Sequence, residues 1–113
     1  MPLSTTGYTA SGAGTTAANG NYVPVVGANA TYNGATQYTN GTDFLAFNGI
    51  ASWVVDSGVN PTGTPLYSAA GTATTFPLSG WAYTLGTAPA PTFAAMSGGG
   101  GGATVVRRPP IFF

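Results

Sequence analysis

Only four side chains in this 113-residue chain carry a charge, and they are the first candidates for chemistry. Asp43 and Asp56 are the carboxylates, and Arg107 and Arg108 are the cations. Two carboxylates that face each other across a hairpin can share a proton or hold a cation. If a four-residue loop, residues 48–51, joins the two strands, Asp43 faces Asp56. With a two-residue Asn-Gly turn the carboxylates are out of register.

Each aspartate also lies at the outer end of an apolar segment, residues 44–47 for Asp43 and residues 53–55 for Asp56. A charge at such a position opposes the aggregation of strands, and we favour this structural interpretation. Catalysis also needs a base, a nucleophile or an oxyanion donor, and the chain has no histidine, cysteine or lysine. We therefore expect no enzyme, no metal site and no cofactor.

Charge and composition limit the partners of the chain. The formal net charge is zero, and two arginines do not make the basic face that binding to nucleic acid requires. No apolar run approaches the roughly 20 residues of a membrane helix. A net charge near zero promotes association, which suits a subunit of an assembly. We expect protein partners and copies of the chain itself, with no nucleic acid and no membrane.

Asn-Gly pairs divide the chain into short segments. They begin at residues 19, 33, 40 and 48. Asn-Gly is typical of tight hairpin turns, because these turns need a positive φ angle that glycine adopts without strain. The segments between the pairs are rich in threonine, aromatic and β-branched residues. The pattern predicts an all-β antiparallel meander with Gly34, Gly41 and Gly49 at positive φ in its turns.

The strands of this meander are apolar on both faces. Phe44 and Ala46 lie on one face of their strand, and Leu45 and Phe47 lie on the other. A lone meander would leave one face to water. We therefore expect a sandwich-like module that folds over itself, or a sheet covered by a neighbouring copy. The covers expected in the first case are Trp81, Tyr83 and Phe93.

Composition changes along the chain predict four parts. Residues 1–20 are small and polar without periodicity, which predicts an extended N-terminal arm. Residues 21–93 hold most of the aromatic side chains and form the β-meander module. Residues 94–103 include five consecutive glycines and are typical of a flexible linker. Residues 104–113 form a C-terminal anchor peptide.

The anchor peptide combines three features that favour binding to another protein. "TVV" favours a strand that adds to a partner's sheet edge. The arginines can pair with acidic groups, and the apolar end can fill pockets. The predicted partner-binding residues are Val105, Val106, Arg107, Arg108, Ile111, Phe112 and Phe113.

The aromatic residues of the module have two interpretations. With the many asparagines and threonines, they could form a surface that stacks on glycans. The candidates for glycan contact are Tyr32, Tyr38, Trp53 and Trp81, with Tyr67 and Tyr83 beside them. The alternative, which we favour, is that they form the core, because large aliphatic residues are scarce and the interior must be filled.

The module also contains a succession of motifs: an Asn-Gly-x-Tyr start, two Tyr/Asn-Gly turns, an aromatic strand, Trp-Val-Val-Asp, Gly-Trp and Pro-x-Pro. These lie at residues 19–22, 32–34, 38–42, 44–47, 53–56, 80–81 and 89–91. In this succession, residues 19–93 resemble a small module of tailed-phage virion proteins and of repeats in some large surface proteins. The resemblance implies no catalytic residues and does not reach the anchor peptide.

These observations predict a virion structural protein, located in the virion and in the host cytoplasm before assembly. We expect a phage capsid decoration or accessory subunit that attaches to the major capsid protein, or to another virion structural protein, through its C-terminal tail. A head-fibre or tail-associated subunit is a close variant. The alternative from another class is an adhesion module that binds host-surface glycans through exposed tryptophan and tyrosine.

Overall fold

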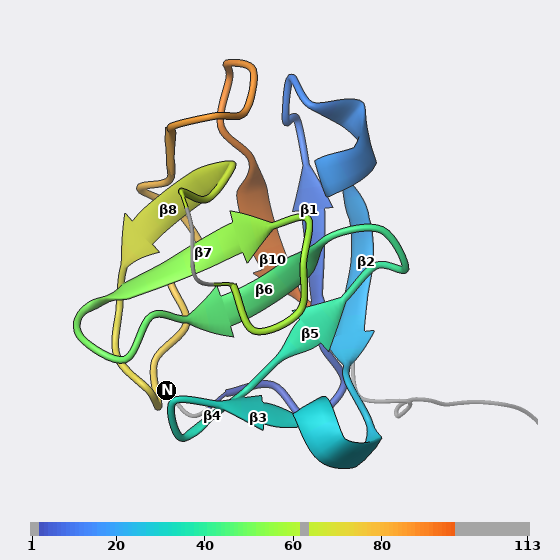
Figure 1. The fold of residues 1–113 in the computed structure, drawn as a ribbon. Coiled ribbons are helices and arrows are strands. Elements are labelled where there is room, and N and C mark those ends of the chain that lie inside the picture. The colour runs from blue at the N-terminus through green and yellow to red at the C-terminus, as the bar shows by residue number, and fades with distance from the viewer. Residues whose placement is uncertain (1–2, 62–63, 97–113) are drawn as a thin grey trace, which may run out of the picture.

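The computed structural model describes residues 3–61 and 64–96 and is all-β over these residues, as predicted (Figure 1). The elements are β1 (Tyr8–Ser11), η1 (Thr16–Ala18), β2 (Gly20–Pro24), η2 (Gly27–Asn29), β3 (Thr31–Tyr32), β4 (Ala35–Thr36), β5 (Tyr38–Thr39), β6 (Phe44–Phe47), β7 (Ser52–Asp56), β8 (Tyr67–Ala70), β9 (Ala82–Tyr83) and β10 (Thr92–Ala95). Both η elements are single 3₁₀ turns. Within the described residues, no helix is long and apolar enough to cross a membrane.

Eight strands form one antiparallel sheet in the order β10-β1-β2-β5-β6-β7-β8-β9, and β3 and β4 form a separate hairpin. Figure 1 shows that the sheet curls, so that β1, β2 and β10 lie behind β6 and β7 and run across them. The backbone N–H of Phe93 in β10 donates to the carbonyl of Leu78 at 2.9 Å. This bond ties the outer edge of the sheet to the segment between β8 and β9. A single curled sheet therefore encloses the core.

The prediction of an extended arm over residues 1–20 is wrong for the part that the structure describes. β1 lies between β10 and β2, where Tyr8 pairs with Ala95 on one side and with Tyr22 on the other. β1 also supplies small buried side chains such as Ala10, which fit beside large aromatic rings. Because these residues are small, the strand shows no apolar periodicity. The module therefore includes β1, and it ends with β10, slightly beyond the predicted boundary at residue 93.

Aromatic rings fill the inside of the curled sheet. The largest core residues, from every long strand and from the segment after β8, are Tyr8, Tyr22, Tyr38, Leu45, Phe47, Trp53, Val55, Tyr67, Phe76, Trp81 and Phe93. Phe76 lies at the centre, with ring centroids 4.0 Å from Tyr8 and 5.1 Å from both Trp53 and Phe93. Trp81 is 5.7 Å away. Trp81 and Phe93 thus cover the inner face as expected, whereas Tyr83 does not enter the core.

The outer face of β6 and β7 is also buried, at Ala46 and Val54. Figure 1 shows the segment that follows β7 crossing over this face. Gln37, whose side chain is fully buried, holds this segment through its amide. Its Nε2 donates to Asn60 Oδ1 at 2.7 Å and to the Asn29 carbonyl at 2.9 Å, and its Oε1 accepts from Asn60 N–H at 3.1 Å. The module therefore covers its second apolar face with its own chain.

The three predicted turn glycines have positive φ angles, as expected. The values are 81° for Gly34, 95° for Gly41 and 87° for Gly49. Asn33 also has a positive φ of 54°, so Asn33 and Gly34 form the tight turn typical of a two-residue hairpin between β3 and β4. The turns at Gly41 and Gly49 are wider, which shifts the strand register described below.

Candidate functional site

The structure places most of the predicted glycan-contact residues in the core. Tyr38 and Trp53 are 0 % exposed, and Trp81 is 9 % exposed. Trp53 Nε1 donates to the Thr72 carbonyl and Trp81 Nε1 donates to the Pro77 carbonyl, each at 2.8 Å. Rings that are packed on all sides cannot stack on a sugar. The glycan interpretation is therefore wrong for these three residues, and the core interpretation is confirmed for them.

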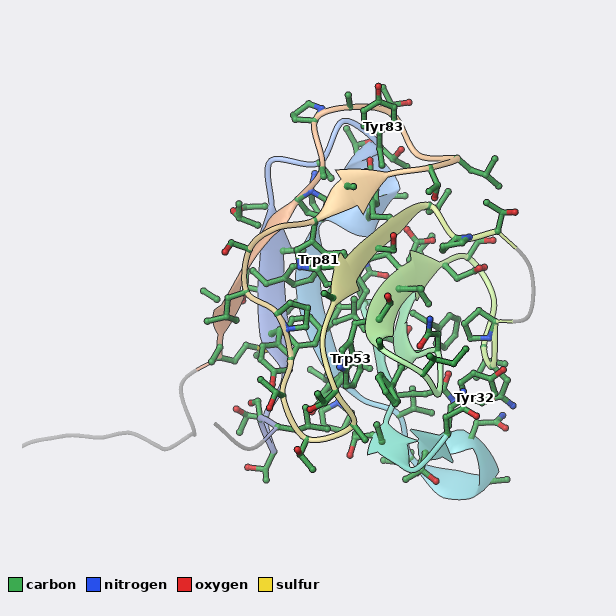
Figure 2. All side chains as sticks on the ribbon, turned by 90° about the vertical axis from the view of Figure 1, so that its left-hand side faces the viewer. Tyr32, Trp53, Trp81 and Tyr83 are labelled. Atoms are coloured by element: carbon green, nitrogen blue, oxygen red, sulfur yellow. The ribbon has the colours of Figure 1, made fainter. Side chains whose placement is uncertain are left out.

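The remaining candidates do not form one aromatic platform. Tyr32 is half-buried, and its hydroxyl donates to the Pro61 carbonyl at 3.0 Å. Tyr83 is 58 % exposed. Figure 2 shows Tyr32 and Tyr83 at opposite ends of the module. Tyr67, between them in sequence, is fully buried. A sugar that stacks on Tyr83 would find no second ring of this set beside it.

The register of β6 and β7 separates the two carboxylates. Asn48 Oδ1 accepts the backbone N–H groups of residues 50, 51 and 52 at 2.9–3.1 Å, so the chain wraps around this side chain. As a result Phe47 pairs with Trp53 and Phe44 pairs with Asp56. The pairing of Asp43 with Asp56 that a four-residue loop would give is off by one residue, and the alternative two-residue turn does not occur either. Asp43 and Asp56 are therefore not directly opposite each other, as sharing a proton or a cation across the hairpin would require.

Asp43 has an unusual environment. It precedes β6 and shares the inward side of this strand with Leu45 and Phe47, because side chains alternate along the chain. The residue is 3 % exposed, and its Oδ2 has no hydrogen-bond partner among the described residues. Burial, with a smaller contribution from the charge of Asp56, raises the pKa of the Asp43 carboxyl. A buried carboxyl does not present a charge to solvent, so it is poorly placed to oppose the aggregation of strands. The interpretation of the aspartates as charges against aggregation therefore fits only Asp56.

The donors around Asp43 are engaged elsewhere. The Tyr22 hydroxyl donates to the Ala18 carbonyl at 2.6 Å. Asn40 Nδ2, from the turn that leads to Asp43, donates to the carbonyls of Ala17 and Asn19 at 2.8 and 3.0 Å. Burial, followed by the charge of Asp43, raises the pKa of Tyr22. The charge of Asp43 therefore acts on Tyr22, but the Tyr22 hydroxyl donates its hydrogen bond to the backbone and not to the carboxyl.

Residues 13–19 and 86–89 close this end of the module, and we call them the end cap. The Tyr67 hydroxyl joins the two segments, because it accepts from Thr15 N–H at 3.0 Å and donates to the Thr87 carbonyl at 2.6 Å. Gly14 N–H donates to the Pro89 carbonyl at 2.9 Å, and Thr87 N–H donates to Thr15 Oγ1 at 2.8 Å. Figure 2 shows both segments at the same end of the molecule, near Tyr83.

Most of the exposed apolar side chains of the described residues lie on loops or at a sheet edge, and Val23 in β2 is an exception. Tyr83 lies in the edge strand β9, and Leu85 lies shortly after this strand. Ile50 and Val26 are the most exposed and lie on loops elsewhere. Exposed apolar groups of this kind are available for contact with another protein.

The predicted partner-binding residues all lie in residues 97–113, outside the described part of the chain. Their role, and the linker, therefore remain predictions. No group of three or more metal-ligating side chains occurs within residues 3–61 and 64–96. No family model, curated protein or solved structure matches the chain.

Proposed function

We propose that this protein is a virion structural subunit, a phage capsid decoration or accessory protein that attaches through residues 104–113. One observation supports this more than any other: the module uses its aromatic side chains to build its interior. Tyr38, Trp53 and Trp81 are core residues, so the module offers little of the aromatic surface that glycan adhesion requires. A β module with its own aromatic core, followed by a predicted binding peptide, is what a structural subunit displayed on a particle would need.

The distribution of charge supports attachment by the C-terminal peptide. Both cations of the chain, Arg107 and Arg108, lie in residues 104–113, and of the two anions Asp43 is buried. The module therefore has little means of choosing a partner by charge, whereas the peptide has two arginines beside strand-forming and apolar residues. The five glycines before it span at most about 17 Å at 3.3–3.6 Å per residue, so the peptide reaches an adjacent subunit.

Deletion of residues 104–113 tests the proposal. Residues 3–96 supply a core of aromatic side chains. The truncated chain is therefore expected to stay folded and soluble but to be lost from purified particles. The measurement is the number of copies per particle, determined by quantitative mass spectrometry. A matched control replaces the five glycines, residues 98–102, by serines, which preserves linker length and flexibility and is expected to keep full loading.

The double substitution of Arg107 and Arg108 by alanine sharpens the test. Loading is expected to fall and to depend less on salt, because the ion pairs with the partner are removed. If the chain lacking residues 104–113 loads as fully as the intact protein, attachment belongs to the module, and the proposal is overturned.

A further inference from the structure

The buried carboxyl of Asp43 is the strongest unexplained feature of the described residues. A buried polar atom without a hydrogen bond is costly, and an ionised one is far more costly than a neutral one. Oδ2 of Asp43 is such an atom. The neighbouring donors, Tyr22 and Asn40, instead donate hydrogen bonds to the backbone carbonyls of residues 17–19. The site therefore accommodates a neutral carboxylic acid better than a carboxylate.

The charged and titratable groups near this carboxyl do not change that preference. Asp56 approaches from β7 with a like charge, and Tyr22 approaches from β2. Tyr67 from β8 lies near Tyr22, and its hydroxyl is engaged with the end cap. The turn of residues 40–42 and the element η1 carry no titratable side chain. No group named here offers a positive charge to an ionised Asp43.

Residues 17–19 are bonded to the two polar side chains beside this carboxyl. Asn40 reaches from the turn that carries Asp43 to the carbonyls of Ala17 and Asn19, and η1, which contains Ala17, is a single 3₁₀ turn. The Tyr22 hydroxyl donates to the Ala18 carbonyl. An ionised carboxyl competes with the Ala18 carbonyl for this hydroxyl, and loss of the bond releases residues 17–19.

We propose that Asp43 is a proton-controlled latch of the end cap: the protonated carboxyl keeps residues 13–19 closed over the core, and loss of the proton loosens them. This inference does not depend on the proposed role in a virion. Proton binding is then tighter in the closed state than in the open state, so closure is favoured at low pH. Stability of the cap decreases as the pH rises above 3.8, the ordinary value for this carboxyl, and becomes constant above its raised value.

Amide hydrogen exchange measured by NMR on the full chain tests the latch. The probes are the N–H groups of Gly14, Thr15, Ala18 and Asn19, which belong to the end cap and each donate a hydrogen bond. Protection factors, corrected for intrinsic exchange, are recorded at a series of pH values upward from 3.8, the ordinary value for this carboxyl. They are expected to decrease with rising pH by at most about tenfold per pH unit, the limit for one proton.

Two variants and one internal control make the result decisive. Asp43→Asn removes the titration and is expected to abolish the decrease, whereas Asp56→Asn is expected to keep it. The N–H groups of Val25 and Gln37, which are bonded outside the end cap, are expected to stay protected throughout. Should Asp43→Asn fail to fold, the carboxyl carbon shift of Asp43 in the unmodified protein is expected to titrate together with the cap amides.

Three results would overturn the latch. The first is a flat pH profile of the cap amides in the unmodified protein, or an unchanged decrease in Asp43→Asn. The second is a parallel decrease at Val25 and Gln37, which would mean global unfolding. The third is protection that increases with pH, which would mean that a cation, such as an arginine of residues 107–108, pairs with Asp43.

Discussion

The inner and outer faces of β6 and β7 are both buried, but they are covered in different ways. On the inner face, Trp53 and its neighbours pack against Phe76, with ring contacts that need no particular donor or acceptor. On the outer face, the cover is held by the amide of Gln37, which bonds to Asn29 and Asn60. Burial of apolar area stabilises the first face, and a small number of directed bonds positions the second.

This difference teaches how a chain with few large aliphatic residues buries a sheet on both sides. Aromatic rings fill the wide inner space, since each buries a large area. Small residues such as Ala46 let a polar loop approach the outer face closely. The outer cover must then satisfy its own polar groups, and Gln37 does so at the point where the segments meet. The two faces should therefore respond differently to substitution.

The largest effect is expected on the inner face. Trp53→Ala leaves a cavity beside Phe76 and Tyr38 and removes the bond to the Thr72 carbonyl. We expect it to lower the free energy of unfolding by about 3–5 kcal/mol, measured by urea denaturation. Tyr83→Ala is the matched aromatic control on the surface and should change stability by no more than about 0.5 kcal/mol. Equal effects of the two substitutions would contradict the placement of the core.

The next largest effect is expected on the outer face. Gln37→Ala removes both ends of the amide network and leaves the carbonyl of Asn29 and the N–H of Asn60 without these partners. We expect a loss of about 1–3 kcal/mol in the free energy of unfolding. Asn21→Ala, which removes only an exposed hydrogen bond with Thr9, is the control. A loss as large as that of Trp53→Ala would show that the two faces do not differ in the way described.

The smallest effects are expected at the turns, and they should rank by the space around each glycine. Valine at Gly34 or Gly41 meets no atom within 4 Å of its Cβ, so its cost is the strain of positive φ, about 1–2 kcal/mol. Valine at Gly49 also places Cβ 2.9 Å from the Asn33 side chain, which bonds to the Phe47 carbonyl. Thermal melting should therefore rank Gly49→Val as the least stable. If all three variants melt like the unmodified protein, the turns are not as described.

Much of this meander could be predicted from turn chemistry and side-chain alternation. Gly34, Gly41 and Gly49 follow asparagine between strand-like segments, and their positive φ angles are what such turns require. The alternation also placed Leu45 and Phe47 on one face and Ala46 on the other, and the structure puts the first two in the core and Ala46 on the outer face. The same alternation places Asp43 on the inner side, although a charge at a strand end suggests the surface.

Other features depend on contacts that the sequence does not display. The register of β6 and β7 is set by one side chain, since Asn48 Oδ1 collects three backbone N–H groups and widens the turn. The sequence does not predict β1, because its inward residue Ala10 is small and becomes a core residue only where aromatic rings from distant strands meet it. In the same way, Gly7 falls in the predicted arm, yet a Cβ there would overlap the Tyr22 carbonyl oxygen.

The position of β1 in the sheet also has a consequence for how the protein is made. Among the strands of the described residues, β1 is the first to leave the ribosome and β10, one of its two neighbours, is the last, with Tyr8 pairing with Ala95. The sheet therefore cannot be completed until synthesis has passed residue 95. Contacts between segments so far apart along the chain form slowly. Until then the edge of β1 and the aromatic rings of β2, β5 and β7 are open to other nascent chains, and this interval is the one in which a chaperone would matter most.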